Sequence, residues 1–228
     1  EKVRKEFAKL GKNASADVYF NSPGGNLVAA LEIGQIIRDA GFNTHIGRKN
    51  SDANDIAPGY CHSSCALAFL GGRYRFWSTD STYGVHLAHR PNSKTDDDLS
   101  LGQILSAGIA RYIREMGADP ALLDLIAKAD PGEIYILSAQ EATDLHVVNN
   151  GRDRAEWTIE ANNGIQYLRG MQNTMYGMGK AVFYCFRGEI TFFSLYEAGQ
   201  KTAAAIARGA WSHSIMFSES QVIPLGRP

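Results

Sequence analysis

The sequence has little cysteine, no long hydrophobic run and almost no net charge. Its 3 cysteines are too few for a disulfide framework, and they lack the paired spacing with histidine that a zinc site needs. A net charge of -1 gives no basic field for a polyanion, so we expect no nucleic-acid partner. No run of about 18 apolar residues is present to form a transmembrane segment. These absences predict a globular protein without metal or cofactor.

The remaining composition agrees with that class. The chain has 228 residues, of which 44% are hydrophobic and 21% charged, enough for one large domain or one with a small companion. It begins at Glu1 rather than Met, and its first residues lack the apolar stretch of a signal peptide. We therefore expect the chain to be processed or trimmed.

The first 150 residues alternate short β-prone runs with helical ones. The predicted helices cover residues 3–10, 27–40, 65–70, 100–116 and 120–128, and Gly41 is the predicted stop of the second. The predicted strands cover residues 17–21, 43–47, 74–77, 83–87, 133–136 and 146–148. Ser138 and Glu141 have the spacing of a capping box, which predicts a further short helix between the last two strands. Such alternation favours an α/β architecture with a parallel sheet.

The composition changes after Gly151. Four aromatic-rich strands are predicted at residues 157–161, 165–168, 181–186 and 190–195, the last two joined as a hairpin across Arg187-Gly188. A helix near 198–208 and a strand near 211–217 follow. We predict a domain at 1–150 and a small β-rich (α+β) accessory domain at 151–228, to which the sequence assigns no role.

Three segments carry residues that can do chemistry. Ser22-Pro23-Gly24-Gly25 is a turn between a strand and a helix, where exposed backbone N–H groups favour an anion. Ser63 and Ser64 stand at a second strand-to-helix turn, where a serine either caps the helix or acts as a nucleophile. His86 ends an apolar strand that can aim its ring, and His89 in the next loop is the competing base.

Taken in this order, the segments resemble the ClpP/crotonase superfamily, and most closely its Clp-type serine peptidases. The resemblance covers about residues 17–148. Its blocks are Ser22-Pro23-Gly24-Gly25, Ser63-Ser64-Cys65-Ala66 with Gly71-Gly72, Gly84-Val85-His86, and Leu137-Ser138-Ala139-Gln140-Glu141-Ala142. It implies a spiral of ββα units, a homo-oligomer and a peptide or protein substrate.

The resemblance also implies roles for individual residues. Ser64 maps to the nucleophile that forms the acyl-enzyme, and His86 to the general base. The backbone N–H groups of Gly25 and Cys65 map to the oxyanion hole. The family's axial N-terminal loop has no visible equivalent, so we do not expect an unfolding ATPase as partner.

One position departs from the family pattern. Clp peptidases carry the third triad residue, an aspartate, where this chain has Ile134. Asp130 and Glu133 are nearby candidates, and a Ser-His dyad without a third residue is the other possibility. Relatives on the same fold use a Ser-Lys dyad, for which Lys128 is available, although the presence of His86 argues against it.

Two other functions remain open. The missing aspartate favours a catalytically impaired, ClpP-like peptide-binding module, and the shared fold allows a crotonase-type enzyme acting on an acyl thioester. Relatives with an appended domain are exported bacterial proteins, which implies a periplasmic or secreted location, with the cytoplasm as the alternative. A disulfide between Cys61 and Cys65 fits export, but the four-residue spacing is tight.

Overall fold

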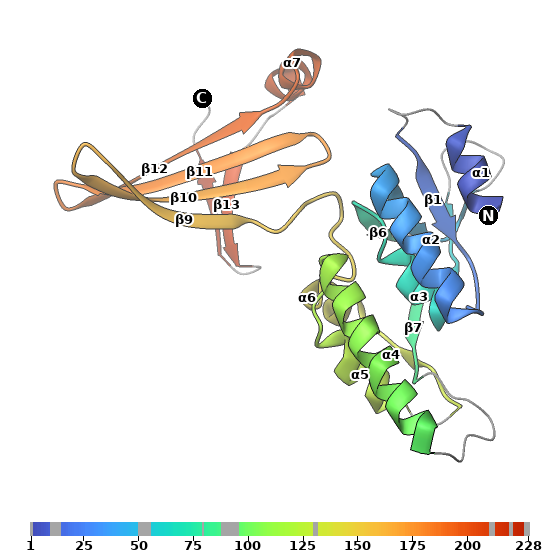
Figure 1. Cartoon of the computed structure of the whole chain (residues 1–228). Helices are drawn as coiled ribbons and strands as arrows, with labels where there is room; N and C mark the ends of the chain where they lie inside the picture. Colours follow the sequence, from blue (N-terminus) through green and yellow to red (C-terminus); the bar gives the residue numbers. More distant parts are fainter. Residues whose placement is uncertain are drawn as a thin grey trace. The chain divides into compact units, whose positions relative to one another are not determined.

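The computed structural model describes residues 2–9, 15–49, 56–78, 80–87, 96–129, 132–209, 213–218 and 221–225. The chain divides into two units, Glu1–Gly151 and Arg152–Pro228 (Figure 1). Within the described ranges, every helix is too short or too polar to cross a membrane.

The first unit is an α/β structure, as the sequence predicts. Its helices are α1 (Lys2–Ala8), α2 (Leu27–Ala40), α3 (Ser64–Phe69), α4 (Asp96–Glu115), α5 (Leu122–Lys128) and α6 (Ala139–Asp144). Its strands are β1 (Asp17–Phe20), β2 (Asn43–Ile46), β3 (Arg48–Lys49), β4 (Ile56–Ala57), β5 (Tyr60–His62), β6 (Arg75–Trp77), β7 (Thr82–Val85) and β8 (Tyr135–Ile136). Strands β1, β2 and β6 form one parallel sheet. In a second sheet, β7 pairs in parallel with β5 and antiparallel with β8.

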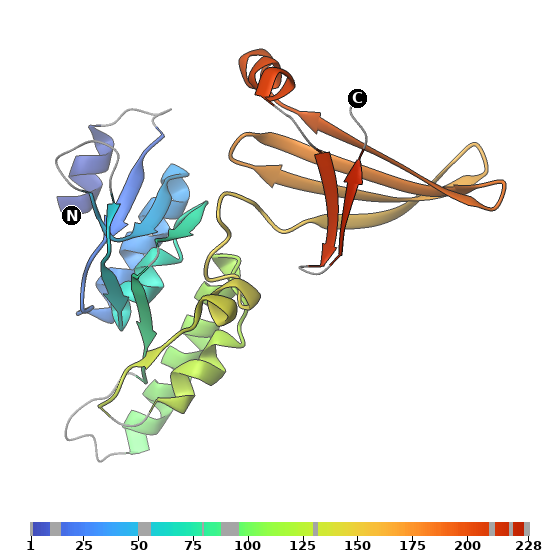
Figure 2. The ribbon, with the colours of Figure 1, turned by 180° about the vertical axis from the view of Figure 1, so that it is seen from behind.

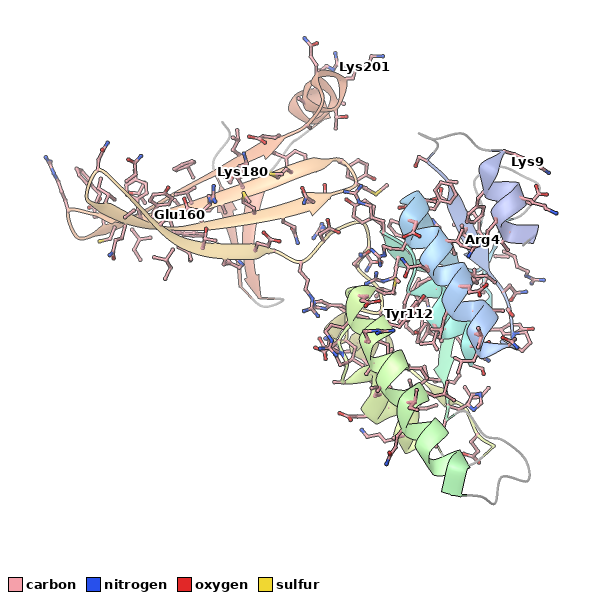
Figure 3. All side chains as sticks on the ribbon, viewed as in Figure 1. Arg4, Lys9, Tyr112, Glu160, Lys180 and Lys201 are labelled. Atoms are coloured by element: carbon pink, nitrogen blue, oxygen red, sulfur yellow. A yellow bond between two sulfur atoms is a disulfide. The ribbon has the colours of Figure 1, made fainter. Side chains whose placement is uncertain are left out.

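Helix α3 lies in the centre of this unit, and all six of its residues are buried. It packs against α2 (Figure 1 and Figure 2). The approach is close, since a Cβ added at Gly71 would lie 2.2 Å from the carbonyl oxygen of Gly34. Tyr112, labelled in Figure 3, reaches from α4 to α3, where its hydroxyl donates to the Leu67 carbonyl at 2.9 Å. Small residues and one buried hydroxyl therefore fix the helix that follows the predicted serine turn.

Local signals set the helix ends that the sequence predicts. The Asn26 side chain accepts a hydrogen bond from the Ala29 N–H at the start of α2. Gly41 ends that helix with a left-handed φ of 68°. The capping box of Ser138 and Glu141 is present at α6. The stop at Gly41 and the capping box, both predicted from the sequence, are confirmed.

The predicted strand at residues 146–148 is wrong. His146 has a φ of 52°, and the segment is a turn. Val147 and Val148 are buried in the core, so their apolar character reflects packing rather than pairing in a sheet. The buried guanidinium of Arg75 donates to the carbonyls of His146 and Val147 in place of a neighbouring strand. The short strands β3 and β4 lie in a segment where no strand is predicted.

The second unit consists mainly of strands. Its elements are β9 (Glu156–Asn162), β10 (Ile165–Thr174), β11 (Gly177–Phe186), β12 (Glu189–Glu197), α7 (Gln200–Gly209), β13 (His213–Ser218) and β14 (Gln221–Leu225). Strands β9 to β12 form an antiparallel meander, and β13 pairs with β14. The predicted hairpin turn is confirmed, since Arg187 and Gly188 have φ values of 53° and 83°.

Candidate active site

Ser63 occupies a sharp turn between β5 and α3. Its φ of 59° and ψ of -130° lie in a region that residues with a Cβ rarely adopt. Its N–H donates to the Gly84 carbonyl at 2.9 Å, and its carbonyl accepts from the Ala66 N–H at 3.0 Å. Its side chain makes no capping hydrogen bond to α3. A strand–turn–helix of this kind leaves the serine oxygen free for another partner.

That partner is His86, which directly follows β7. Its Nε2 lies 2.7 Å from Ser63 Oγ, and its Nδ1 lies 2.8 Å from the carbonyl oxygen of Leu87. Because a carbonyl oxygen only accepts, we assign the ring proton to Nδ1. Nε2 is then the acceptor for the Ser63 hydroxyl.

In the structure His86 contacts Ser63 rather than Ser64, the serine to which the family resemblance maps the nucleophile. Ser64 is the first residue of α3, and only 7% of its surface is exposed. Cys65, the next residue, is 5% exposed and is bonded through its sulfur to Cys61. If Ser63 is the reacting group, the amide that follows it belongs to Ser64 and not to Cys65.

The glycine-rich turn lies against the serine turn. The His62 N–H donates to the Ser22 carbonyl at 3.1 Å, which joins the two segments. A Cβ added at Gly24 would lie 2.7 Å from both Ser63 Cβ and the His62 carbonyl oxygen. Gly24 also has a φ of 102°. Only glycine fits between the two turns, so the structure brings these two predicted blocks together.

A cavity of about 200 Å³ opens at the same place. It is lined by Gly25, Leu27, Ser63, Ser64, Ala66, Leu67, Val85, His86, Ile109 and Ile126. Apart from the two serines and the histidine, the lining side chains are apolar. The site thus combines a hydroxyl, an imidazole and backbone amides at one end of a small apolar cavity.

The position expected to hold a third catalytic residue is apolar. Ile134 lies beside β7, with Cγ2 2.5 Å from a Cβ added at Gly84, and it is 40% exposed. Glu133 and Lys128 are exposed. Asp130 and His89 lie outside the described residues. The Leu87 carbonyl, which the sequence did not suggest, occupies the Nδ1 side of His86.

His62 lies next to Ser63 but has a different partner. Its Nε2 is 2.8 Å from Thr82 Oγ1. Burial lowers the pKa of His62 below its ordinary value of 6.5, which favours the neutral ring. No group of three or more potential metal ligands comes together among the described residues.

A disulfide joins Cys61 in β5 to Cys65 in α3, with 5.2 Å between their Cα atoms. The sequence left this pairing open because the spacing is tight. The turn at Ser63 brings the end of the strand and the start of the helix close enough for the bond. Cys185, in the second unit, is a free and exposed thiol.

Comparison with known proteins gives no assignment. The sequence matches no protein-family model and no curated protein. One similar solved structure is a serine-to-alanine mutant of the 1510-N membrane-bound stomatin-specific protease, with 15% identity and a TM-score of 0.46 over 65% of this chain and 70% of that one. Another is a lysine-to-alanine mutant of that protease in complex with a substrate peptide. It has 17% identity and a TM-score of 0.47, and the match covers 65% of this chain and 66% of that one. Similarity at this level assigns neither a family nor an activity, so any assignment rests on the site itself.

Proposed function

We propose that the first unit is a serine hydrolase that cleaves peptide bonds in peptide or protein substrates. The observation that carries the proposal is the 2.7 Å contact between Ser63 Oγ and His86 Nε2. Ser63 attacks the carbonyl carbon of the substrate while His86 takes its proton. His86 returns that proton to the leaving amine, and water then hydrolyses the acyl-enzyme. The resemblance to Clp-type peptidases supports a peptide bond as the target.

The oxyanion hole is proposed from two backbone amides. The N–H of Ser64 follows the nucleophile, and the N–H of Gly25 belongs to the adjoining glycine turn. Both residues line the cavity that Ser63 and His86 share. Each donor in such a hole is worth about 10²–10³ in rate. This assignment keeps Gly25 from the sequence prediction and moves the second amide from Cys65 to Ser64.

The Leu87 carbonyl takes the orienting role that an aspartate has in a triad. It holds the Nδ1 proton and so directs the basic Nε2 towards Ser63. Being neutral, it stabilises the charged imidazolium of the transition state less than a carboxylate does. Loss of the acid in a serine triad costs about 10⁴ in rate, so we expect slow turnover.

Fluorophosphonate labelling tests the proposal. The native chain and its Ser63→Ala, Ser64→Ala and His86→Ala variants are compared, and the adduct is located by peptide mass spectrometry. We expect the adduct on Ser63 and its loss in Ser63→Ala. Ser64→Ala is the matched control, because it removes only a side chain and leaves the amide in place. An adduct on Ser64 would return the nucleophile to its predicted position.

A second candidate is a peptide-binding module with impaired chemistry. Ile134 favours this candidate, because Clp peptidases carry the aspartate of the triad at this position. Peptide binding that survives Ser63→Ala, with no labelling or turnover in either protein, would support it. The crotonase-type alternative predicts binding of coenzyme A thioesters, which equilibrium binding measurements check directly.

We further propose a periplasmic or secreted location. Its support is the Cys61–Cys65 disulfide, because such bonds persist in oxidising compartments and are rare in the cytosol. Fractionation of a producing bacterium checks this proposal. A homo-oligomer remains a proposal from the family resemblance, which light scattering of the purified chain tests.

A further inference from the structure

The Cys61–Cys65 disulfide encloses the proposed nucleophile. Cys61 lies in the strand that enters the turn, and Cys65 lies in the first turn of the helix that leaves it. Ser63 is the middle residue of the five that the bond closes into a ring. The covalent link therefore fixes both flanks of the residue whose oxygen faces His86.

The conformation of Ser63 needs such support. Its φ of 59° and ψ of -130° cost free energy for a residue with a Cβ, and they persist only where the surroundings hold them. The Ser63 N–H and carbonyl are each held by one backbone hydrogen bond, to Gly84 and Ala66. The side chain makes no bond to α3 that would add to these. The disulfide supplies a link that does not depend on hydrogen bonds.

The bond is poorly suited to a general stabilising role. In the loop-closure account, a disulfide stabilises a fold more when it closes a longer segment, and this ring contains few residues. Its effect is therefore concentrated at the turn. Both cysteines lie in the core, at 0% and 5% exposure, so the link is anchored in rigid surroundings.

We propose that this disulfide is a positioning element of the active site, and that catalysis by Ser63 is conditional on its oxidation. The disulfide form is active, and the dithiol form is not. The proposal rests on Ser63 being the nucleophile, as inferred above from its contact with His86. It makes the enzyme inactive in a reducing compartment and active after export to an oxidising one.

The activating step is a thiol–disulfide exchange with a disulfide-bearing oxidant while the chain folds, before the core buries both cysteines. One cysteine thiolate attacks a sulfur of the oxidant, forming a mixed disulfide and releasing one thiol of the oxidant. The second cysteine thiolate then attacks the protein's sulfur and displaces the other thiol. The two cysteines lose two electrons and two protons in total, and the oxidant's disulfide is reduced to two thiols.

The test compares the two redox forms of the full chain. The protein is unfolded and refolded with or without a phosphine reductant, and thiol titration must give three thiols in the reduced form against one in the oxidised form. We expect fluorophosphonate labelling of Ser63 to be about 100-fold slower in the reduced form, as small displacements of a reacting group cost this much. Unfolding the reduced protein and refolding it with oxidised glutathione is expected to restore labelling, because both thiols are buried in the folded chain. Peptide turnover is expected to lose kcat with little change in KM.

Variants separate positioning from stability. The double variant Cys61→Ala/Cys65→Ala is expected to label as slowly as the reduced form, while Cys185→Ser labels at the native rate. Val147→Ala, a core change outside the cavity, is expected to lower the melting temperature without slowing labelling below that temperature. Equal labelling of the oxidised, reduced and double-variant proteins would overturn the positioning role and leave the proposed function intact.

A readout that needs no catalysis keeps the two proposals apart. Amide hydrogen exchange in residues 61–66 is expected to accelerate on reduction while the rest of the core stays protected. If no form is labelled but this exchange accelerates, the hydrolase proposal fails and the disulfide still holds the turn. If exchange in the turn is the same in both redox forms, the positioning role is overturned.

Discussion

Ser63 Oγ and His86 Nε2 lie 2.7 Å apart although 23 residues separate them in the chain. The parallel pairing of β5 and β7 explains this, because it places His62 opposite Gly84. Ser63 and His86 therefore both follow the carboxyl ends of neighbouring parallel strands. That edge of a sheet is where α/β proteins place their ligands.

The imidazole of His86 is the group that we expect labelling to depend on most. Replacing it in His86→Ala removes the acceptor of the Ser63 proton, and we expect fluorophosphonate labelling to fall by about 10²–10⁴. His62→Ala is the control, since its ring faces Thr82 and a loss of only a few-fold is expected. The opposite order of effects would make His62 the base. Both labelling rates are measured by in-gel fluorescence of samples quenched at successive times.

Gly24 is expected to tolerate no side chain. In Gly24→Ala the new Cβ would collide with Ser63 Cβ and the His62 carbonyl, at a φ of 102° that disfavours alanine. We expect labelling to fall at least about 10-fold and unfolding free energy to fall by about 1–3 kcal/mol. Gly108→Ala in α4 is the control, since its Cβ meets nothing within 4 Å and alanine favours a helix. Urea unfolding and labelling of both variants test the contrast.

The buried Arg75 side chain is expected to be a main source of stability in the first unit. Arg75 is 2% exposed. Its guanidinium donates to the carbonyls of Gly72, Met116, His146 and Val147 at 2.7 to 3.1 Å. Arg75→Met removes this donor from all four carbonyls, of which that of Met116 keeps a second donor, Arg38, at 2.8 Å. We expect a loss of about 3–5 kcal/mol in the free energy of unfolding. Arg73→Met, at an exposed position, is expected to change stability by less than about 0.5 kcal/mol in the same urea titration.

The sequence identified the segments that the structure brings together at the candidate site, but it favoured Ser64 where the structure places Ser63 against His86. The blocks around Gly24, Ser63 and His86 were recognised from turn chemistry and family order, and the structure places them together. Choosing between Ser63 and Ser64 depends on which residue ends the strand and which begins the helix. A Ser-Ser pair carries no local signal for that boundary. The contact of the Leu87 carbonyl with His86 was not predicted, because every residue has a backbone carbonyl and the sequence does not show which one accepts.

The secondary structure was predicted best where a local interaction defines the end of a helix. Gly41 and the Ser138 capping box set helix boundaries by local interactions, and both were predicted from the sequence. The failure at His146–Val148 has a tertiary cause. Two valines fill the core there, and a side chain 71 residues away in sequence, Arg75, satisfies the His146 carbonyl. Periodicity alone does not distinguish such a segment from a strand.

The capping box of α6 makes the stability of the first unit depend on pH in the acid range. Glu141 accepts hydrogen bonds from the Tyr135 hydroxyl at 2.6 Å and from the Ser138 N–H and hydroxyl at 2.8 Å each. These bonds, that of Tyr135 first, hold the pKa of Glu141 below its ordinary value of 4.5. Because the pKa of Glu141 is lower in the folded state, its carboxylate stabilises the fold above pH 4.5. This stabilisation is lost as the pH falls through the folded-state pKa.

Glutamine keeps the capping geometry without a titrating charge, so Glu141→Gln isolates this effect. We expect the variant to melt below the native chain at pH 7. The difference in melting temperature is expected to shrink as the pH falls below 4.5 and through the lowered pKa of Glu141, because the native carboxylate then takes up its proton. Glu133→Gln, at an exposed position in the same region, serves as the control. Its difference in melting temperature from the native chain is expected to stay the same across this pH range. Melting curves followed by circular dichroism from pH 3 to 7 measure it, and a constant difference across this range would show that the charge of Glu141 does not contribute.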